Sequence, residues 1–374
     1  MLDIPKTMRA VVYRGVNDLR LETVPVPRIG ANELLVKVAV CGVCPTDIKK
    51  IQHGTVAPPR IFGHETAGMI VKIGAGRGTR GFKIGDRVAL HHHVPCLGCH
   101  FCRHRAFAQC ETYKRTGITA GFEPAGGGYA EFVRVMPFVL PGVVKIPARN
   151  SFEEGAMLEP VNTVLKAVKR LNLLPGDNVL VTGQGPIGLM FTKILRLQGV
   201  NVLATDLLDA RLKLAKKFGA KWVVVASSSG RESAHYSSKN SQSRLTSAAT
   251  VERLDAAIIA VPSDAAVAQA LRLVRGGGQI LLFAHTKRAE QIQNSSPFSL
   301  DLASICLDEK DLIGSYSSDF TLQDEVARLV FSRRFDVRQL ITHRFPLEET
   351  SAAVALAANP KPDSLKILVS LLRH

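Results

Sequence analysis

The feature that most constrains the fold is a glycine motif between two strand-like runs in the second half of the chain. The apolar run VLVT is followed by GQGPIG, then by an amphipathic helical pattern, and then by a second strand-like run, VLATD. In such a unit Gly183 permits a tight turn, Gly185 lets the backbone approach a bound group, and Gly188 lets helix and strand pack closely. This order of parts predicts a doubly wound, Rossmann-type domain.

The same unit predicts a bound dinucleotide. The helix that begins at Pro186 and Ile187 directs its N-terminal N–H groups at a pyrophosphate. Asp206 ends the second strand about twenty residues on, where a carboxylate accepts hydrogen bonds from ribose hydroxyls and repels a 2'-phosphate. We therefore expect NAD as the cofactor. NADP is the alternative because Arg211 lies nearby, and capping of the next helix is the alternative role for Asp206.

The length and the pattern predict two domains. A chain of 374 residues is too long for one ordinary core. Short strand-like runs separated by Gly and Pro predict a compact, barrel-like β domain in the first 150 residues. They are Met8–Tyr13, Leu34–Val40, Gly68–Ile73, Arg87–Leu90 and Tyr129–Val135.

From Ser151 onwards, strand-like and helical stretches alternate, which predicts a parallel sheet covered by helices on both faces. The expected boundaries are residues 1–157 for the β domain, completed by 307–374, and 158–306 for the α/β domain. Ser151 and Glu154 form a capping-box pattern that opens a helix, and Pro160 is expected to break it. The Ser-rich stretch 226–250 reads as a surface loop or an exposed helix, and the strand-like tail LKILVSLL as a return to the first domain.

Charge and hydropathy limit the partners. The chain has 48 Lys and Arg residues and 32 Asp and Glu residues, so its net charge is +16. A positive charge of this size would suit a nucleic-acid partner. Lys and Arg occur in ones and twos, however, and so we expect no nucleic-acid partner. The chain has no run of eighteen apolar residues, and its first residues have no signal-peptide core, so we expect no membrane partner and a cytoplasmic location.

Four of the seven cysteines lie within fifteen residues. Cys96, Cys99, Cys102 and Cys110 follow the pattern CxxCxxC and, after seven residues, a fourth Cys. Four thiolates complete the shell of a closed, tetrahedral structural zinc site, which leaves no position for a substrate. An iron–sulfur cluster, which uses similar spacing, is the alternative.

A second group of possible metal ligands lies upstream. Cys44 follows the strand-like run LLVKVAV, and His64 and Glu65 follow about twenty residues later. One thiolate, one imidazole and one or two carboxylates make a zinc site that keeps a position for water or substrate. Alternatively, Cys41 and Cys44 form a CxxC redox pair, although the sequence around them is not thioredoxin-like.

Taken together, these motifs resemble the zinc-containing medium-chain dehydrogenase family, closest to its sorbitol and threonine dehydrogenase branch. The matching pieces span most of the chain in the family's order. They are CGVCPTD, GHETAG, GFKIGDRV, the four-cysteine lobe, GGGYAEFV, LEP and GQGPIG. The resemblance implies a GroES-like catalytic domain made from both ends of the chain and a central Rossmann domain.

The resemblance also implies roles for individual residues. Cys44 and His64 would be zinc ligands, Glu65 a carboxylate that binds or exchanges on the metal, and Glu159 the carboxylate that the polyol branch has in place of a cysteine. Zinc would lower the pKa of the substrate hydroxyl, and Thr46 would take its proton. Two positions depart from the family pattern. Lys49 stands where a proton-relay histidine is common, so that His53 or water would replace it, and Lys50 stands where sorbitol dehydrogenases tend to have an aromatic residue.

The sequence thus predicts a zinc-dependent oxidoreductase that moves a hydride between NAD(H) and an alcohol, best a polyol or sugar alcohol. One catalytic and one structural zinc are expected per chain, and the family implies a homodimer or homotetramer. The alternatives are a threonine-type or simple secondary-alcohol dehydrogenase, a zinc-free reductase of the same fold, and a zinc-containing nucleic-acid-binding protein.

Overall fold

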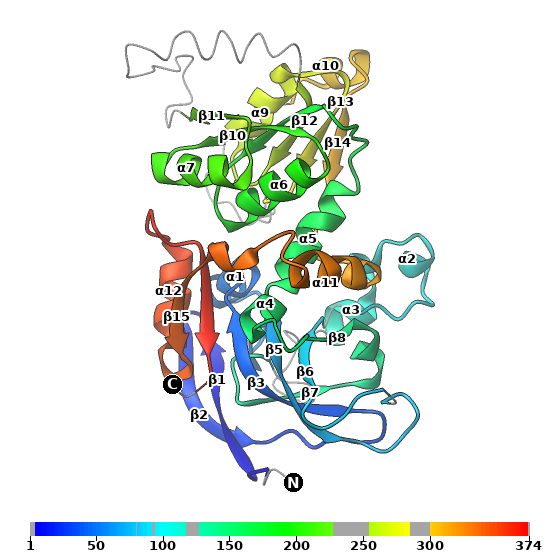
Figure 1. Cartoon of the computed structure of the whole chain (residues 1–374), viewed down its shortest axis with the longest axis vertical. Coiled ribbons are helices and arrows are strands. Elements are labelled where there is room, and N and C mark those ends of the chain that lie inside the picture. Colours follow the sequence, from blue (N-terminus) through cyan, green and yellow to red (C-terminus); the bar gives the residue numbers. More distant parts are fainter. Residues whose placement is uncertain are drawn as a thin grey trace. The chain divides into compact units, whose positions relative to one another are not determined.

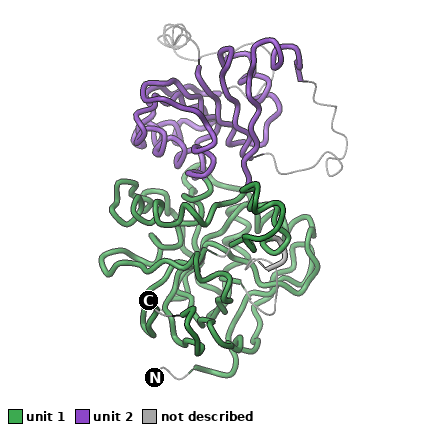
Figure 2. The backbone as a smooth tube through the Cα atoms, turned by 90° about the vertical axis from the view of Figure 1, so that its right-hand side faces the viewer, with its two compact units in different colours: residues 1–163, 317–374 green, residues 164–316 purple. Residues whose placement is uncertain are grey.

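The computed structural model describes residues 4–79, 81–91, 94–116, 127–226, 254–284 and 300–372. The chain divides into two compact units, one of residues 1–163 and 317–374 and one of residues 164–316 (Figure 2). The expected Ser-rich loop lies almost entirely outside the described residues. Within the described residues, no helix is long and apolar enough to cross a membrane.

The first unit is built on two sheets. A three-stranded sheet has the order β2-β1-β4 and a larger one the order β15-β16-β3-β5-β6-β8, with β7 also paired to β3. Their bounds are β1 Thr7–Gly15, β2 Asp18–Pro25, β3 Leu34–Gly42, β4 Arg60–Ile61, β5 Glu65–Ile73, β6 Arg87–Leu90, β7 Phe132–Val135, β8 Val143–Lys145, β15 Ile341–Pro346 and β16 Lys366–Ser370. An isolated bridge pairs Ala10 of β1 with Ala130, just before β7, and the buried apolar side chains of this unit form two clusters.

The C-terminal strand completes this unit. β16 pairs antiparallel with β3, with Leu368 opposite Gly42, which confirms that the tail returns to the first part of the chain (Figure 1). Gly42 is also opposite Glu65 in the pairing of β3 with β5. The strand register therefore places β16 beside the start of β5, although about 300 residues separate them along the chain.

Helices and short 3₁₀ turns connect and flank these strands. Their bounds are α1 Pro45–His53, α2 His100–Arg103, η1 Phe107–Gln109, α3 Glu111–Thr116, η3 Pro137–Gly142, α4 Phe152–Ala156, α5 Leu158–Val168, η5 Phe320–Leu322, α11 Gln323–Phe331, η6 Val337–Leu340, η7 Leu347–Glu349 and α12 Thr350–Ala358. The capping box of α4 forms as predicted, with the Ser151 hydroxyl accepting from the Glu154 N–H and the Glu154 carboxylate accepting from the Ser151 N–H.

One expectation about this segment is wrong. The helix breaks at Met157, not at Pro160, and Glu159 and Pro160 both lie in the first turn of α5. A proline is tolerated in a first helical turn because its missing N–H has no partner there in any case. Glu159 is thus presented by a helix and not by a break in one.

The second unit is a parallel six-stranded sheet of order β11-β10-β9-β12-β13-β14. The bounds are β9 Asn178–Thr182, α6 Pro186–Leu197, β10 Asn201–Asp206, α7 Asp209–Phe218, β11 Trp222–Val225, β12 Leu254–Ile259, α9 Asp264–Leu273, β13 Val274–Leu282, α10 Leu302–Leu307 and β14 Asp311–Gly314. Because crossovers are right-handed and the strand order reverses between β9 and β12, α6 and α7 cover one face and α9 the other (Figure 1). This is the Rossmann order, in which ligands bind where the order reverses.

Candidate functional site

The ends of two neighbouring strands of the first unit supply a compact set of metal-ligand atoms. Cys44 follows β3 and is the N-cap of α1, while His64 and Glu65 stand at the start of β5. The thiol sulfur, an imidazole nitrogen and a carboxylate oxygen of these residues lie within 4.8 Å of one another. His64 and Glu65 are buried and Cys44 is half-buried. The structure therefore brings three of the four expected ligands together.

A hydrogen-bond chain fixes the imidazole. His64 Nδ1 lies 3.2 Å from Asp47 Oδ1, and the Tyr129 hydroxyl donates to the other carboxylate oxygen over 3.4 Å. All three side chains are buried. Burial alone would raise the pKa of Asp47, but the nearby His64, Lys50 and Lys366 hold it below the usual value, so the carboxylate stays charged. An imidazole oriented at Nδ1 presents Nε2 to a metal.

The Glu65 carboxylate is held by a lysine from the C-terminal strand. Lys366 Nζ donates to Glu65 Oε1 over 2.5 Å, contacts Oε2 as well, and donates to the carbonyl of Val43 over 3.0 Å. Burial opposes the charge on Lys366, yet Glu65 and Cys44 raise its pKa above the usual value. A Cβ on Gly42 would lie 1.8 Å from Glu65 Oε2, so only glycine leaves room for this carboxylate.

Glu159 lies beside this group but is not a member of it. The three converging donors do not include its carboxyl group. Burial raises the pKa of Glu159 to about 7, with Glu65 acting in the same direction and His64 in the opposite one. Its side chain is only 5% exposed. The structure thus places a second buried carboxyl within electrostatic range of His64 and Glu65.

The helix that follows Cys44 carries the remaining expected residues. The Thr46 N–H donates to Cys44 Sγ over 3.5 Å, and Thr46 is half-buried. Lys49 and Lys50 are half-buried in the next turn, and His53 is exposed at the last residue of α1. The first turn of α1 therefore faces the metal-ligand group, and the helix leads away from it.

Cys41 does not act with Cys44. It lies inside the core, and its thiol contacts the Thr66 hydroxyl at 3.4 Å and the Gly42 carbonyl at 3.6 Å. Burial raises the pKa of Cys41 to about 12. Because the thiolate is the reactive form of cysteine, this thiol is inert at neutral pH, which argues against the CxxC redox hypothesis.

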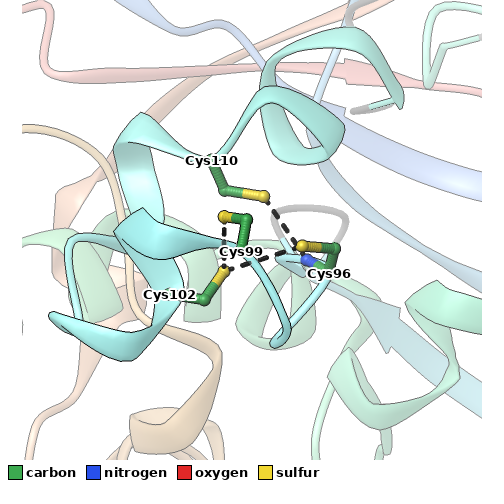
Figure 3. A group of neighbouring side chains, drawn as sticks. All are labelled: Cys96, Cys99, Cys102 and Cys110. Atoms are coloured by element: carbon green, nitrogen blue, oxygen red, sulfur yellow. Dashed lines mark hydrogen bonds between the residues drawn. The ribbon is translucent and has the colours of Figure 1, made fainter.

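The four-cysteine lobe folds into a second compact site, shown in Figure 3. All four sulfur atoms lie within 4.8 Å of one another, and two of the separations are 3.5 Å and 3.9 Å. Four sulfur atoms at about 2.3 Å from a tetrahedral zinc are about 3.8 Å apart. An iron–sulfur cluster places iron and sulfide between its cysteines and needs wider spacing. The four residues, Cys96, Cys99, Cys102 and Cys110, therefore fit zinc.

The electrostatics of the lobe favour a thiolate at Cys110. Burial would raise the pKa of Cys110, but the N–H groups of Cys96 and Tyr113 and the neighbouring thiols bring it down to about 6. The Cys96 N–H lies 3.4 Å from Cys110 Sγ. Cys102 has its pKa raised to about 12 by burial and by its thiol neighbours. A metal ion that neutralises this group would lower the pKa of Cys102 as well.

In the second unit, the glycine turn has the predicted geometry. Gly183 has a φ of 86°, in the left-handed region, and directly follows β9. A Cβ on Gly188 would lie 1.7 Å from the carbonyl oxygen of Gly183, so α6 packs on the turn only because the residue is glycine. Gly185 is the N-cap of α6, with Pro186 as its first helical residue.

Asp206 is tied to this turn. Its carboxylate accepts from the Gln184 N–H over 2.6 Å and from the Leu208 N–H over 2.9 Å. Leu208 is the N-cap of α7, so Asp206 links the glycine turn to the start of the next helix. Arg211 Nη1 would lie 3.9 Å from a Cβ on Gly185. The residues proposed for the dinucleotide therefore lie next to one another in this unit.

Sequence reasoning missed three residues of the first site. Asp47 is the last residue of the CGVCPTD motif, but nothing in the sequence indicates its buried hydrogen bond to His64. Tyr129 contacts the site from a strand-like run interpreted as core. Lys366 lies 301 residues from Glu65, and only the pairing of β16 with β3 brings it there.

Comparison with known proteins identifies the family. An alcohol dehydrogenase GroES-like domain matches residues 30–148, and a zinc-binding dehydrogenase domain matches residues 186–332. The sorbitol dehydrogenase of Bos taurus is 30% identical over 371 residues, which cover 98% of this chain and 96% of that protein. This chain belongs to the zinc-containing medium-chain alcohol dehydrogenase family. The predicted fold class, a GroES-like domain with a Rossmann domain, is thereby confirmed.

Other relatives agree. The sorbitol dehydrogenase of Bacillus subtilis strain 168 is 28% identical over 372 residues, which cover 98% of both chains. The alcohol dehydrogenase TADH from Thermus sp. ATN1 is 27% identical, with a TM-score of 0.79 over 97% of this chain and 99% of that one. The medium-chain dehydrogenase described here is therefore an oxidoreductase of the sorbitol dehydrogenase-like branch.

Proposed function

We propose that this dehydrogenase moves a hydride between NAD and a hydroxyl-bearing carbon of a polyol or sugar alcohol. The observation that carries the proposal is the convergence of the Cys44, His64 and Glu65 donor atoms within 4.8 Å, next to the buried carboxyl of Glu159. Relatives named sorbitol dehydrogenase and D-xylulose reductase support a polyol as the substrate class.

Zinc is the metal that this donor set fits. One thiolate, one imidazole and a carboxylate are common ligands of catalytic zinc, which keeps a further position open. Cys44 and His64 are assigned as zinc ligands. Glu65, whose charge Lys366 neutralises, is assigned as the third donor. Glu159 is assigned as the carboxylate that exchanges with Glu65. When bound, zinc supplies Lewis acidity that lowers the pKa of a coordinated hydroxyl group.

Thr46 is assigned to proton transfer. It is half-buried in the first turn of α1, two residues after Cys44. Its hydroxyl accepts the proton of the substrate hydroxyl and passes it on towards solvent. His53 stands seven residues further along the helix, which is about 10 Å at 1.5 Å per residue. The proton therefore leaves Thr46 to water, because the His53 ring is too far away for direct transfer.

NAD is assigned to the second unit. The α6 N-terminus at Pro186 and Ile187 offers N–H groups to the pyrophosphate, and Gly183, Gly185 and Gly188 leave the room for it. Asp206 retains lone pairs on both carboxylate oxygens for the ribose hydroxyls, and its charge disfavours a 2'-phosphate. Arg211 is assigned to the adenosine side of the same cofactor.

The four-cysteine lobe is assigned to structural zinc, since its four sulfur donors leave no position for a substrate. The first unit is proposed as the catalytic domain and the second as the NAD-binding domain. Four cysteines gathered as metal ligands favour a reducing compartment, so we place the protein in the cytoplasm. A homodimer or homotetramer is proposed from the family resemblance.

The test is NAD reduction measured over polyols, sugars, amino alcohols and simple alcohols, each repeated with NADP. Turnover of polyols with NAD supports the proposal. Activity on aliphatic alcohols alone would show a simple alcohol dehydrogenase, and activity on amino alcohols alone a threonine-type enzyme. Absence of dinucleotide reduction with every compound would refute the proposed function.

A further inference from the structure

The chain passes between its two compact units twice (Figure 2). The first crossing lies between Thr163 and Val164, inside the continuous helix α5. The second crossing lies between Tyr316 and Ser317, in an irregular segment that joins β14 to η5. Hydrogen bonds within a helix fix its backbone, whereas an irregular segment depends on contacts with other parts of the structure. The side chains that contact the second crossing therefore determine its conformation.

The two crossings are bound to each other within each unit. In the first unit, the buried Asn162 amide donates to the Asp319 carbonyl over 2.9 Å and accepts from the Asp319 N–H over 2.8 Å. In the second unit, Lys166 Nζ donates to the carbonyl of Tyr316 over 2.8 Å. The crossings thus form one double connection, in which α5 is the regular member.

The four-cysteine lobe also holds the second crossing. The Tyr113 hydroxyl, in α3, forms a hydrogen bond with the hydroxyl of Ser317, the first residue after the crossing. The rings of Phe107 and Phe320 meet edge-on, with their centroids 5.6 Å apart. Two side chains of the lobe therefore contact the segment that leads from the crossing into η5.

Tyr113 connects this crossing with a metal-ligand atom. Its backbone N–H forms a hydrogen bond to the Cys110 thiol, and its buried side chain packs with Cys102 and Cys110 in one cluster. Its hydroxyl forms the bond to Ser317. One residue thus contacts both the sulfur atom that is proposed to bind the lobe zinc and the crossing.

The backbone of Ser317 also needs support. Its φ is 63°, in the left-handed region that residues other than glycine rarely adopt. Such a conformation persists only where surrounding contacts impose it, and strained residues of this kind gather at sites with a function. The bond from Tyr113 is one such contact.

The proposed function places the zinc ligands Cys44 and His64 in the first unit and NAD in the second. Hydride transfer needs the reacting atoms about 3 to 3.5 Å apart and aligned. We propose that Tyr113 is a positioning residue for hydride transfer, because its bond to Ser317 makes the four-cysteine lobe set the conformation of the second crossing. The lobe thereby acts on the alignment of cofactor and substrate. The proposal rests on the proposed function, which assigns NAD and the alcohol to different units.

The experiment compares the wild type, Tyr113→Phe, Ser317→Ala and the double variant, each loaded with two zinc ions. The rate constant of hydride transfer is measured by stopped flow as the first turnover of NADH formation, at saturating NAD and saturating amounts of the polyol that the substrate panel ranks first. Two further readouts need no turnover. They are the calorimetric Kd of NAD and the hydrogen–deuterium exchange of residues 315–322. Ser332→Ala is the matched control, because the Ser332 hydroxyl donates to the Leu329 carbonyl at the end of α11.

We expect Tyr113→Phe and Ser317→Ala each to lower the rate constant about 2- to 10-fold, the effect of one lost hydrogen bond. The double variant should lose no more than either single variant, because both substitutions remove the same bond. Exchange in residues 315–322 should become faster by a similar factor. The Kd of NAD should change by less than about twofold, since the residues assigned to NAD lie in the other unit, and Ser332→Ala should change none of these values.

Two results would overturn the inference while leaving the proposed function intact. One is an unchanged rate of hydride transfer in both single variants. The other is a loss of rate that only follows a lower zinc content or melting temperature, which would show a merely structural role. Ser317→Ala leaves the lobe itself unaltered and so decides the question if Tyr113→Phe does not fold.

If the wild type reduces NAD with no compound, the proposed function fails, and the exchange measurement decides alone. Faster exchange of residues 315–322 in Tyr113→Phe would then retain Tyr113 as the residue that holds the crossing. Unchanged exchange would remove that role.

Discussion

The substitution Asp47→Asn tests whether a positioning residue holds the metal site together. The Asp47 carboxylate lies 3.2 Å from His64 Nδ1, and neither side chain is more than 4% exposed. A hydrogen bond between charged, buried groups contributes about 1.5 to 3 kcal/mol, or about 10- to 150-fold in an equilibrium constant. Loss of such a partner typically costs a metal site 10- to 100-fold in affinity. We therefore expect the variant to bind the zinc at His64 about 10- to 100-fold more weakly.

The affinity for zinc is measured by competition with a chromophoric chelator, and the titration is fitted with two zinc-binding sites per chain. Only the event at Cys44 and His64 should change in Asp47→Asn, because among the described residues the Asp47 carboxylate contacts His64 and Tyr129 and not the four-cysteine lobe. Tyr129→Phe, which removes the other bond to Asp47, should cause a smaller loss. Asp86→Asn is the matched control, since Asp86 forms an ion pair with Lys145 over 2.7 Å and belongs to neither group of ligand atoms. Unchanged affinity for both zinc ions in Asp47→Asn, with an unchanged melting temperature, would show that Asp47 does not position His64 for the metal.

Three further predictions concern other parts of the structure. Gly188→Ala should abolish measurable NAD binding in calorimetry and lower the melting temperature, because the alanine Cβ would lie 1.7 Å from the Gly183 carbonyl oxygen. Tight binding of NAD by this variant would contradict the prediction. Cys102→Ser should remove one zinc and destabilise the lobe, whereas retention of both ions would argue against a structural site. Glu33→Gln should destabilise the protein by about 1 to 3 kcal/mol at pH 7. Burial raises the pKa of Glu33, but Arg134 and the Gly30 N–H outweigh burial and hold the pKa below its usual value. The stabilisation by the Glu33 carboxylate is therefore fully present above the unfolded-state pKa of about 4.3, and it is lost as the pH falls through the folded-state pKa. If the melting temperatures of the wild type and Glu33→Gln differ as much at pH 3 as at pH 7, this prediction is wrong.

Local patterns predicted most of the fold. Short strand-like runs between Gly and Pro located β1, β3, β6 and the core of β5, and the glycine turn placed β9, α6 and β10 in the right order. Such elements are readable because their periodicity and turn residues act over a few neighbouring positions. The start of β5 was missed by three residues, since Glu65 and Thr66 are polar although both are buried.

The break of the helix near Glu159 shows where local rules fail. A proline disfavours helical geometry in the residue before it, and this pointed to a break at Pro160. The chain instead starts a new helix at Leu158, so that Pro160 lies in a first turn, where it costs little. The break at Met157 decides whether Pro160 lies inside a helix or in a first turn, and the residues around Pro160 do not predict that break.

The candidate site was predictable in its ligands and not in its supporting contacts. Cys44, His64 and Glu65 stand in motifs with recognisable spacing, and the structure brings their donor atoms together. The lysine that neutralises Glu65 comes from the last strand, and no feature near Lys366 in the sequence points to it. Such a partner follows from the pairing of β16 with β3, which is a property of the whole fold.

Zinc content per chain, measured together with alcohol-dependent NAD reduction in the wild type and in Cys44→Ser, tests the assignment of catalytic zinc. We expect two zinc ions in the wild type, one for each cluster of ligand atoms, and one in Cys44→Ser with loss of activity. Two zinc ions in the variant, or one in the wild type with activity that Cys44→Ser leaves unchanged, would contradict the assignment of catalytic zinc to Cys44 and His64.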